Sequence, residues 1–164
     1  GYTKPQYSVS AIVNLKYNDW EDSYFMTTDG KDRSFGTSGT DSTNIGLRAW
    51  IRPEEDGSVM PSISVGYDIS DIQYGADTVD QTDMYFVGLG WADIIQADDK
   101  IGVAIGQPQT TEDESSSPFT WEAYYSFKPN DSIEVTPAIF ASSDRDGTND
   151  GDVTGAVIET TFKF

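Results

Sequence analysis

Residues 7 to 17 read Tyr7-Ser-Val-Ser-Ala-Ile-Val-Asn-Leu-Lys-Tyr17, and apolar and polar side chains alternate along them. The odd positions are apolar and the even positions are polar or small, with Ile12 as the exception. Because successive side chains of a strand point to opposite faces, this pattern predicts a strand with one apolar face. Tyr7 and Tyr17 flank an aliphatic centre, as aromatic girdles flank the hydrocarbon layer in membrane barrels.

The same alternation recurs in seven further segments. They are residues 44–52, 62–69, 85–91, 101–105, 119–127, 133–141 and 155–164. In the last segment the even-numbered residues, not the odd-numbered ones, form the apolar face. Eight strands of about ten residues predict an all-β fold, an antiparallel up-and-down transmembrane β-barrel that is complete or part of a larger barrel. We expect a single domain over residues 1–164.

The predicted connections alternate in length. Residues 18–43, 70–82, 107–118 and 143–152 form long polar loops, and residues 53–60, 92–99 and 129–131 form shorter turns. Outer-membrane barrels have short periplasmic turns and long extracellular loops, so both termini are expected in the periplasm. A soluble β-sandwich also has alternating strands, and in that alternative the odd-numbered faces pack inward.

Composition excludes several classes of function. The net charge is −18, which disfavours nucleic-acid binding. Cys and His are both absent, which removes thiolate chemistry and the commonest general base and metal ligand, so we expect no enzyme and no cofactor. No run approaches the roughly 20 apolar residues of a membrane helix. The sequence starts at Gly1 without a leader, which suggests a mature or truncated form.

The end of the chain, Glu159-Thr-Thr-Phe-Lys-Phe164, is an alternating strand with a terminal Phe. It resembles the C-terminal signal that the barrel-assembly machinery of bacteria recognises, and the resemblance assigns that role to Phe162 and Phe164. Together with the stretch 128–140, the last forty residues resemble the final hairpin of cyanobacterial outer-membrane porins of the carbohydrate-selective porin family.

This resemblance implies a passive pore for ions, carbohydrates and other small hydrophilic solutes in a cyanobacterial outer membrane, in contact with lipid and compatible with a homo-oligomer. Members of that family have a further N-terminal domain and about twice this number of strands. The chain is therefore either the C-terminal half of a porin barrel or a short relative that closes on eight strands.

The even-numbered residues of the first seven strands are expected to face inward. The candidate pore-lining residues, with the inward residue of the last strand, are Lys16, Arg48, Trp50, Arg52, Asp68, Glu122, Lys128, Glu134 and Glu159. They either line water and set ion preference, or pair as the packed polar interior of a small barrel. Five acidic residues lie outside the predicted loops and turns, and none is expected on the odd-numbered apolar face. They are Asp68, Asp83, Glu122, Glu134 and Glu159.

Other motifs are weaker. Trp50 between two arginines could stack on a sugar, although packing is the commoner role of an inward aromatic residue. The loop 144–152 has many oxygen ligands, but Thr148 and Val157 occupy positions where an EF-hand loop needs acidic ligands, so we expect no metal site. A structural or adhesive barrel without a pore and a soluble carbohydrate-binding β-domain remain as alternatives to a channel.

Overall fold

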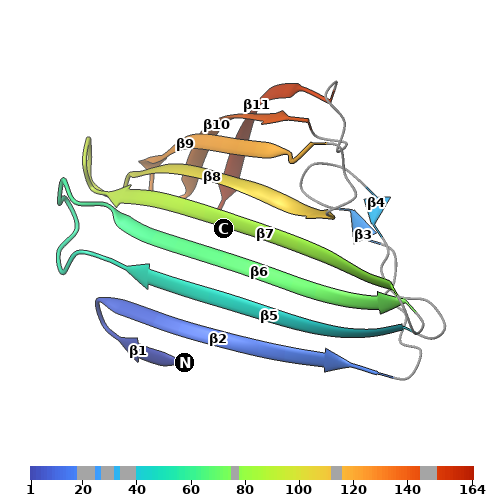
Figure 1. Cartoon of the computed structure of the whole chain (residues 1–164). Coiled ribbons are helices and arrows are strands. Elements are labelled where there is room, and N and C mark those ends of the chain that lie inside the picture. Colours follow the sequence, from blue (N-terminus) through green and yellow to red (C-terminus); the bar gives the residue numbers. More distant parts are fainter. Residues whose placement is uncertain (18–24, 27–31, 34–39, 75–77, 112–115, 145–150) are drawn as a thin grey trace.

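The computed structural model describes residues 1–17, 25–26, 32–33, 40–74, 78–111, 116–144 and 151–164. They form one nine-stranded antiparallel sheet in which each strand pairs with its neighbours along the chain (Figure 1). Its strands are β1 Tyr2–Lys4, β2 Tyr7–Lys16, β5 Thr40–Ile51, β6 Ser62–Tyr74, β7 Thr78–Ala92, β8 Lys100–Thr111, β9 Phe119–Asn130, β10 Ile133–Ser143 and β11 Val153–Phe162. A separate two-stranded sheet pairs β3 Phe25–Met26 with β4 Asp32–Arg33.

The eight long strands coincide with the eight that the sequence predicts, and the all-β, antiparallel, up-and-down arrangement is confirmed. The short strands β1, β3 and β4 were not predicted. Figure 1 shows a curved sheet with β2 near one edge and β11 at the other. Within the described residues no pairing joins these two edges, so the closed barrel that the sequence predicts is not observed.

The predicted loop at residues 70–82 is wrong, because β6 and β7 continue through it as a paired hairpin up to Tyr74 and Thr78. Apart from the buried Ile72, the side chains described in this extension are polar, and Gln81 Nε2 donates a hydrogen bond to Asp71 Oδ1 at 2.9 Å. Likewise β8 extends to Thr111, inside the predicted loop 107–118. Backbone pairing therefore continues where the apolar alternation stops, and the alternation marks only the apolar part of each strand.

The two faces of the sheet differ in exposure. We call the even-numbered residues of β2, β5–β7, β9, β10 and β8 up to Pro108, with the odd-numbered residues of β11, the sheltered face, and the opposite set the apolar face. Beyond Pro108 a register shift reverses the two faces of β8, so that Thr110 pairs with Asp83 on the apolar face. Among the described strand residues every buried one is even-numbered: Ser42, Gly46, Gly66, Ile72, Thr82, Gly102, Pro108, Thr110, Ser126 and Ser142. Ile72 is the one large hydrophobic side chain buried in the described part of the chain.

The apolar face, by contrast, is open. Val13 on β2 is 60% exposed, Leu47 on β5 46% and Ile139 on β10 53%. Ile12 and Val157 are apolar exceptions on the sheltered face. A single layer of sheet thus buries small and polar side chains and exposes its hydrophobic ones, the reverse of a water-soluble domain. No helix in the described residues is long and apolar enough to cross a membrane.

The β7–β8 turn is held by one buried carboxylate. Asp99 accepts hydrogen bonds from the backbone amides of Ile94, Ile95 and Gln96 at 2.9 to 3.0 Å, and from the Tyr125 hydroxyl at 3.2 Å. Burial alone would raise the pKa of the Asp99 carboxyl, but these hydrogen bonds outweigh it and lower the pKa below its ordinary value. The turn is therefore built around an ionised side chain.

Replacing Asp99 with Asn is expected to lower the midpoint of thermal unfolding at pH 7. Because the folded-state pKa is depressed, the stabilisation by Asp99 is present above its unfolded pKa of about 3.9 and is lost as the pH falls through the lower folded value. The difference between wild type and D99N should therefore vanish in acid. Asp131→Asn, in the exposed β9–β10 turn, is the control. A D99N defect that is constant with pH would contradict this role.

Candidate functional site

The sheltered face is lined largely by small residues. Following the pairing from β5 to β8, one row of opposed residues reads Arg48, Gly66, Phe86 and Gly106. The next row, from β5 to β11, reads Trp50, Ser64, Gly88, Ala104, Glu122, Phe140 and Gly155. Glycine, serine or alanine thus separates most of the bulky side chains along these rows, and Glu122 and Phe140 are the adjacent exception.

Three aromatic rings lie over glycines that pair directly with them. A Cβ atom on Gly66 would overlap the ring of Phe86, and a Cβ on Gly155 would overlap the ring of Phe140. Gly102 and Tyr124 repeat the arrangement between β8 and β9. An aromatic ring that covers a glycine shields the exposed strand backbone and fixes the register of the two strands.

Replacing Gly102 with Ala should lower the free energy of unfolding by about 1 to 3 kcal/mol, because the new methyl group displaces the Tyr124 ring. Gly88→Ala on the same face is the matched control, since no atom lies within 4 Å of its added Cβ. We expect the control to change stability by less than about 1 kcal/mol. Denaturant unfolding of the detergent-solubilised protein measures both, and equal losses would show that ring contact is irrelevant.

The predicted residues Arg48 and Asp68 form a two-point ion pair on the sheltered face. Arg48 Nη1 donates to Asp68 Oδ1 at 2.8 Å, and Nη2 donates to Oδ2. The guanidinium also lies 5.5 Å from the centroid of the Phe86 ring. Both side chains remain partly exposed, so the pair adds little to stability but places two opposite charges side by side on this face.

Arg52 lies just beyond the end of β5, where its Nε donates to the carbonyl oxygen of Pro5 at 2.7 Å. Its guanidinium is 5.3 Å from the centroid of the Trp50 ring. The hydrogen bond to Pro5 thus stabilises the β1–β2 turn. The guanidinium also covers a face of the Trp50 ring on which a sugar would stack.

A second polar group lies near the short-turn end. Ser126 donates to Glu134 Oε1 at 2.8 Å, and the Thr136 hydroxyl donates to the Ser126 oxygen at 2.9 Å. Lys100, Lys128 and Lys163 supply positive charge around Glu134. Lys128 Nζ also lies 3.5 Å from Asp98 Oδ1 in the β7–β8 turn. Lysines therefore compensate the charges of Glu134 and Asp98 at this end of the sheet.

The remaining predicted residues are spread along the sheet. Lys16 is opposite Ser42 on β5, and Glu159 is opposite Thr136 on β10. Asp83 was expected off the apolar face, but it pairs with Ile69 and lies on that face at the long-loop end, where Gln107 Nε2 donates to it at 3.2 Å. The side chain of Phe162 is 57% exposed and that of Phe164 is fully exposed.

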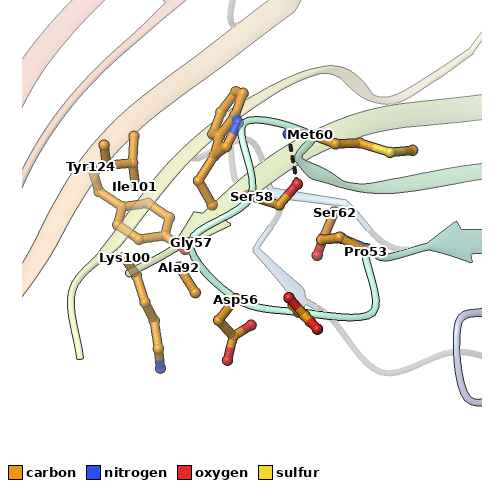
Figure 2. A pocket seen from close by; sticks show the side chains of 13 residues that line it. Pro53, Asp56, Gly57, Ser58, Met60, Ser62, Ala92, Lys100, Ile101 and Tyr124 are labelled. Atoms are coloured by element: carbon orange, nitrogen blue, oxygen red, sulfur yellow. Dashed lines mark hydrogen bonds between the residues drawn. The ribbon is translucent and has the colours of Figure 1, made fainter. Parts of the chain in front are cut away.

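At the short-turn end, Figure 2 shows a pocket of about 190 Å³ between the β5–β6 turn, β7, β8 and Tyr124. The Met60 amide donates to Ser58 Oγ, drawn as a dashed line, and Trp91 Nε1 donates to the Val59 carbonyl oxygen at 3.0 Å. Gly57 has a positive φ of 76°, which glycine adopts at no steric cost. The pocket is smaller than typical ligand sites of about 300 Å³ or more, and its hydrogen bonds serve the turn.

The described residues contain no group of three or more acidic side chains arranged to hold a metal ion. The acidic loop 144–152 lies mostly outside the described residues; at its start Asp144 has a φ of 49°, and its amide donates to Asp152 Oδ1 at 3.2 Å. The acidic residues of loop 112–114 also lie outside them.

The sequence analysis did not identify the roles of Phe86, Tyr124 and Phe140. A ring can be matched to the glycine that it covers only when the register of the neighbouring strands is known. Comparison with known proteins gives no further guide to this surface: no protein-family model, no curated protein and no solved structure matches the chain.

Proposed function

We propose that the chain forms the wall of a passive diffusion channel for ions and small hydrophilic solutes in an outer membrane of the Gram-negative type. One observation carries this proposal: the sheet shelters its small and polar residues and exposes its hydrophobic ones. A lipid-facing exterior and a watery interior demand that distribution. In water the same distribution would leave a large apolar surface uncovered.

The hydrophobic side chains of the apolar face form a band that crosses the strands obliquely. The direction of this band supports a membrane-spanning wall. One row of opposed residues is apolar on β2, β5 and β6 but polar on β7: Val13, Ile45, Ile69 and Asp83. Nearer the short-turn end, Trp91, Ile101 and Tyr125 continue the band across β7 to β9. The band therefore shifts by about one residue per strand. With a rise of about 3.4 Å per residue and a strand spacing of about 4.8 Å, this shift corresponds to strands tilted by roughly 35° from the barrel axis. Transmembrane strands tilt by about this angle.

The size of the sheltered side chains favours an open lumen. An eight-stranded barrel is just wide enough for interior side chains to fill it. Gly88, Ala104 and Ser64 lie next to one another in a single row and cannot fill such a space. We therefore favour a wider barrel to which this chain contributes eight long strands, with its two free edges paired to further strands.

Channel activity is tested by reconstituting the purified protein into a planar bilayer, where we expect discrete conductance steps. Gly88→Trp should lower the step size, because a side chain at this position would project into open space on the sheltered face. Leu89→Trp, its neighbour on the apolar face, should leave the step size unchanged. Protein that stays soluble and monomeric without detergent would overturn the proposal.

A barrel without an open pore is the second candidate, because the Arg48–Asp68 pair and the Glu134–Ser126–Thr136 hydrogen bonds are the kind of network that fills a polar barrel interior. It would insert into lipid as readily as a channel does. A folded, membrane-inserted protein that never conducts would favour this candidate.

A further inference from the structure

The largest hollow among the described pockets lies on the sheltered face where β7, β8, β9 and β10 run side by side. Its volume is about 550 Å³, within the range of small-molecule sites. The sheltered-face residues that line it are mostly apolar: Met84, Phe86, Ala104, Thr120, Glu122 and Phe140. It lies apart from the Glu134 group and from the pocket beside the β5–β6 turn.

Glu122 is the one charged residue of this lining. It is opposed by Ala104 on β8 and by Phe140 on β10, neither of which can neutralise it. Within the described part of the chain, Glu122 makes no hydrogen bond or ion pair, and no basic residue lines the hollow. The hollow therefore combines an uncompensated carboxylate with an apolar floor.

Two aromatic rings bound the hollow. Phe86 lies over Gly66 on one side, and Phe140 lies over Gly155 on the other, so each ring is held against the sheet by a glycine. Gly106 forms part of the floor, where a Cβ atom would overlap the backbone of Tyr85. Rings in fixed positions beside a carboxylate suit a ligand that has an aromatic or alkyl body and one positive charge.

We propose that this hollow binds small organic monocations of the arylammonium or alkylammonium class, with Glu122 contacting the positive charge and Phe140 the apolar body. The site needs the sheltered face to be in contact with water, as in the proposed channel, but its occupancy can be measured without conductance. A bound cation would occupy the lumen beside Glu122 and would hinder the passage of other cations.

The test is a titration of the detergent-solubilised, folded protein with benzyltrimethylammonium, followed by isothermal titration calorimetry. Saturable binding is expected. Glu122→Gln should weaken it about two- to fivefold, the effect of losing one exposed charge contact. Ala104→Leu should weaken it at least as much by filling the hollow. Glu54→Gln, which removes the same charge from the distant β5–β6 turn, should leave binding unchanged.

Two further probes test separately how much the positive charge and the apolar body of the ligand contribute to binding. Tetramethylammonium keeps the charge without the ring and should bind more weakly, and benzoate keeps the ring with the opposite charge and should not bind. Equal affinity of wild type and E122Q for benzyltrimethylammonium would overturn the proposal and indicate a purely apolar occupant such as detergent. Absence of saturable binding to wild type would also overturn it. Because binding is read without a bilayer, failure of the channel and failure of this site are distinguishable.

Discussion

Val65→Arg is expected to lower the free energy of unfolding in lipid by about 2 to 4 kcal/mol, the cost of an arginine near the bilayer midplane on the lipid side of a barrel. Val65 lies on the apolar face near the middle of the apolar part of β6, residues 63–69, and its side chain is 39% exposed. In a protein whose apolar face met water, the same change would fall within about 0.5 kcal/mol, because exposed surface positions tolerate substitution.

Ser64→Arg is the matched control, since Ser64 is the preceding residue, is also exposed, and lies on the sheltered face. It should fold into vesicles with a stability close to that of wild type. Urea titration of protein folded into vesicles measures both variants. If Val65→Arg proved as harmless as Ser64→Arg, lipid would not cover the apolar face, and the membrane assignment would fail with it.

If the chain forms the proposed channel, Asp68→Asn is expected to raise its anion-to-cation permeability ratio several-fold, and Arg48→Gln to lower it by a similar factor. The two side chains cancel one another in the wild type through their two-point contact on the sheltered face. Removing either leaves one uncompensated charge beside the path of the ions. The reversal potential across a planar bilayer under a KCl gradient reports the sign and size of each shift.

The double variant R48Q/D68N should return to a value near wild type, which controls for a nonspecific change in the shape of the pore. A shift in the same direction for both single variants would show that the pair does not face permeating ions. The sequence also predicts a mild cation preference from the acidic long loops, which would fade with salt because exposed charges are screened over about 8 Å. Most of those loop residues lie outside the described structure, so that preference stays a prediction.

Period-two alternation was enough to predict the number of long strands, their order and their common apolar face. The reason is physical: along a strand the side chains alternate between two faces. When the two faces of a sheet lie in different environments, apolar and polar residues therefore alternate in the sequence. The alternation predicted the apolar portions of β2 and β6 well, and it failed at residues 70–82, where strand pairing continues although the described side chains, apart from Ile72, are polar.

Register and curvature are what the sequence could not supply, because both depend on contacts between residues far apart in the chain. Only paired strands reveal that Phe140 covers Gly155, that Arg48 reaches Asp68, and that Glu122 lies between Ala104 and Phe140. The sequence predicted that the even-numbered residues face inward, but it left open a soluble sandwich in which the odd-numbered faces pack inward, and only the curved sheet draws one of these two sets of side chains together. The sequence by itself determined that the sheet has an apolar and a polar face, whereas the tertiary structure decided that the apolar one is exposed, because exposure is a property of the assembled surface and not of any strand alone.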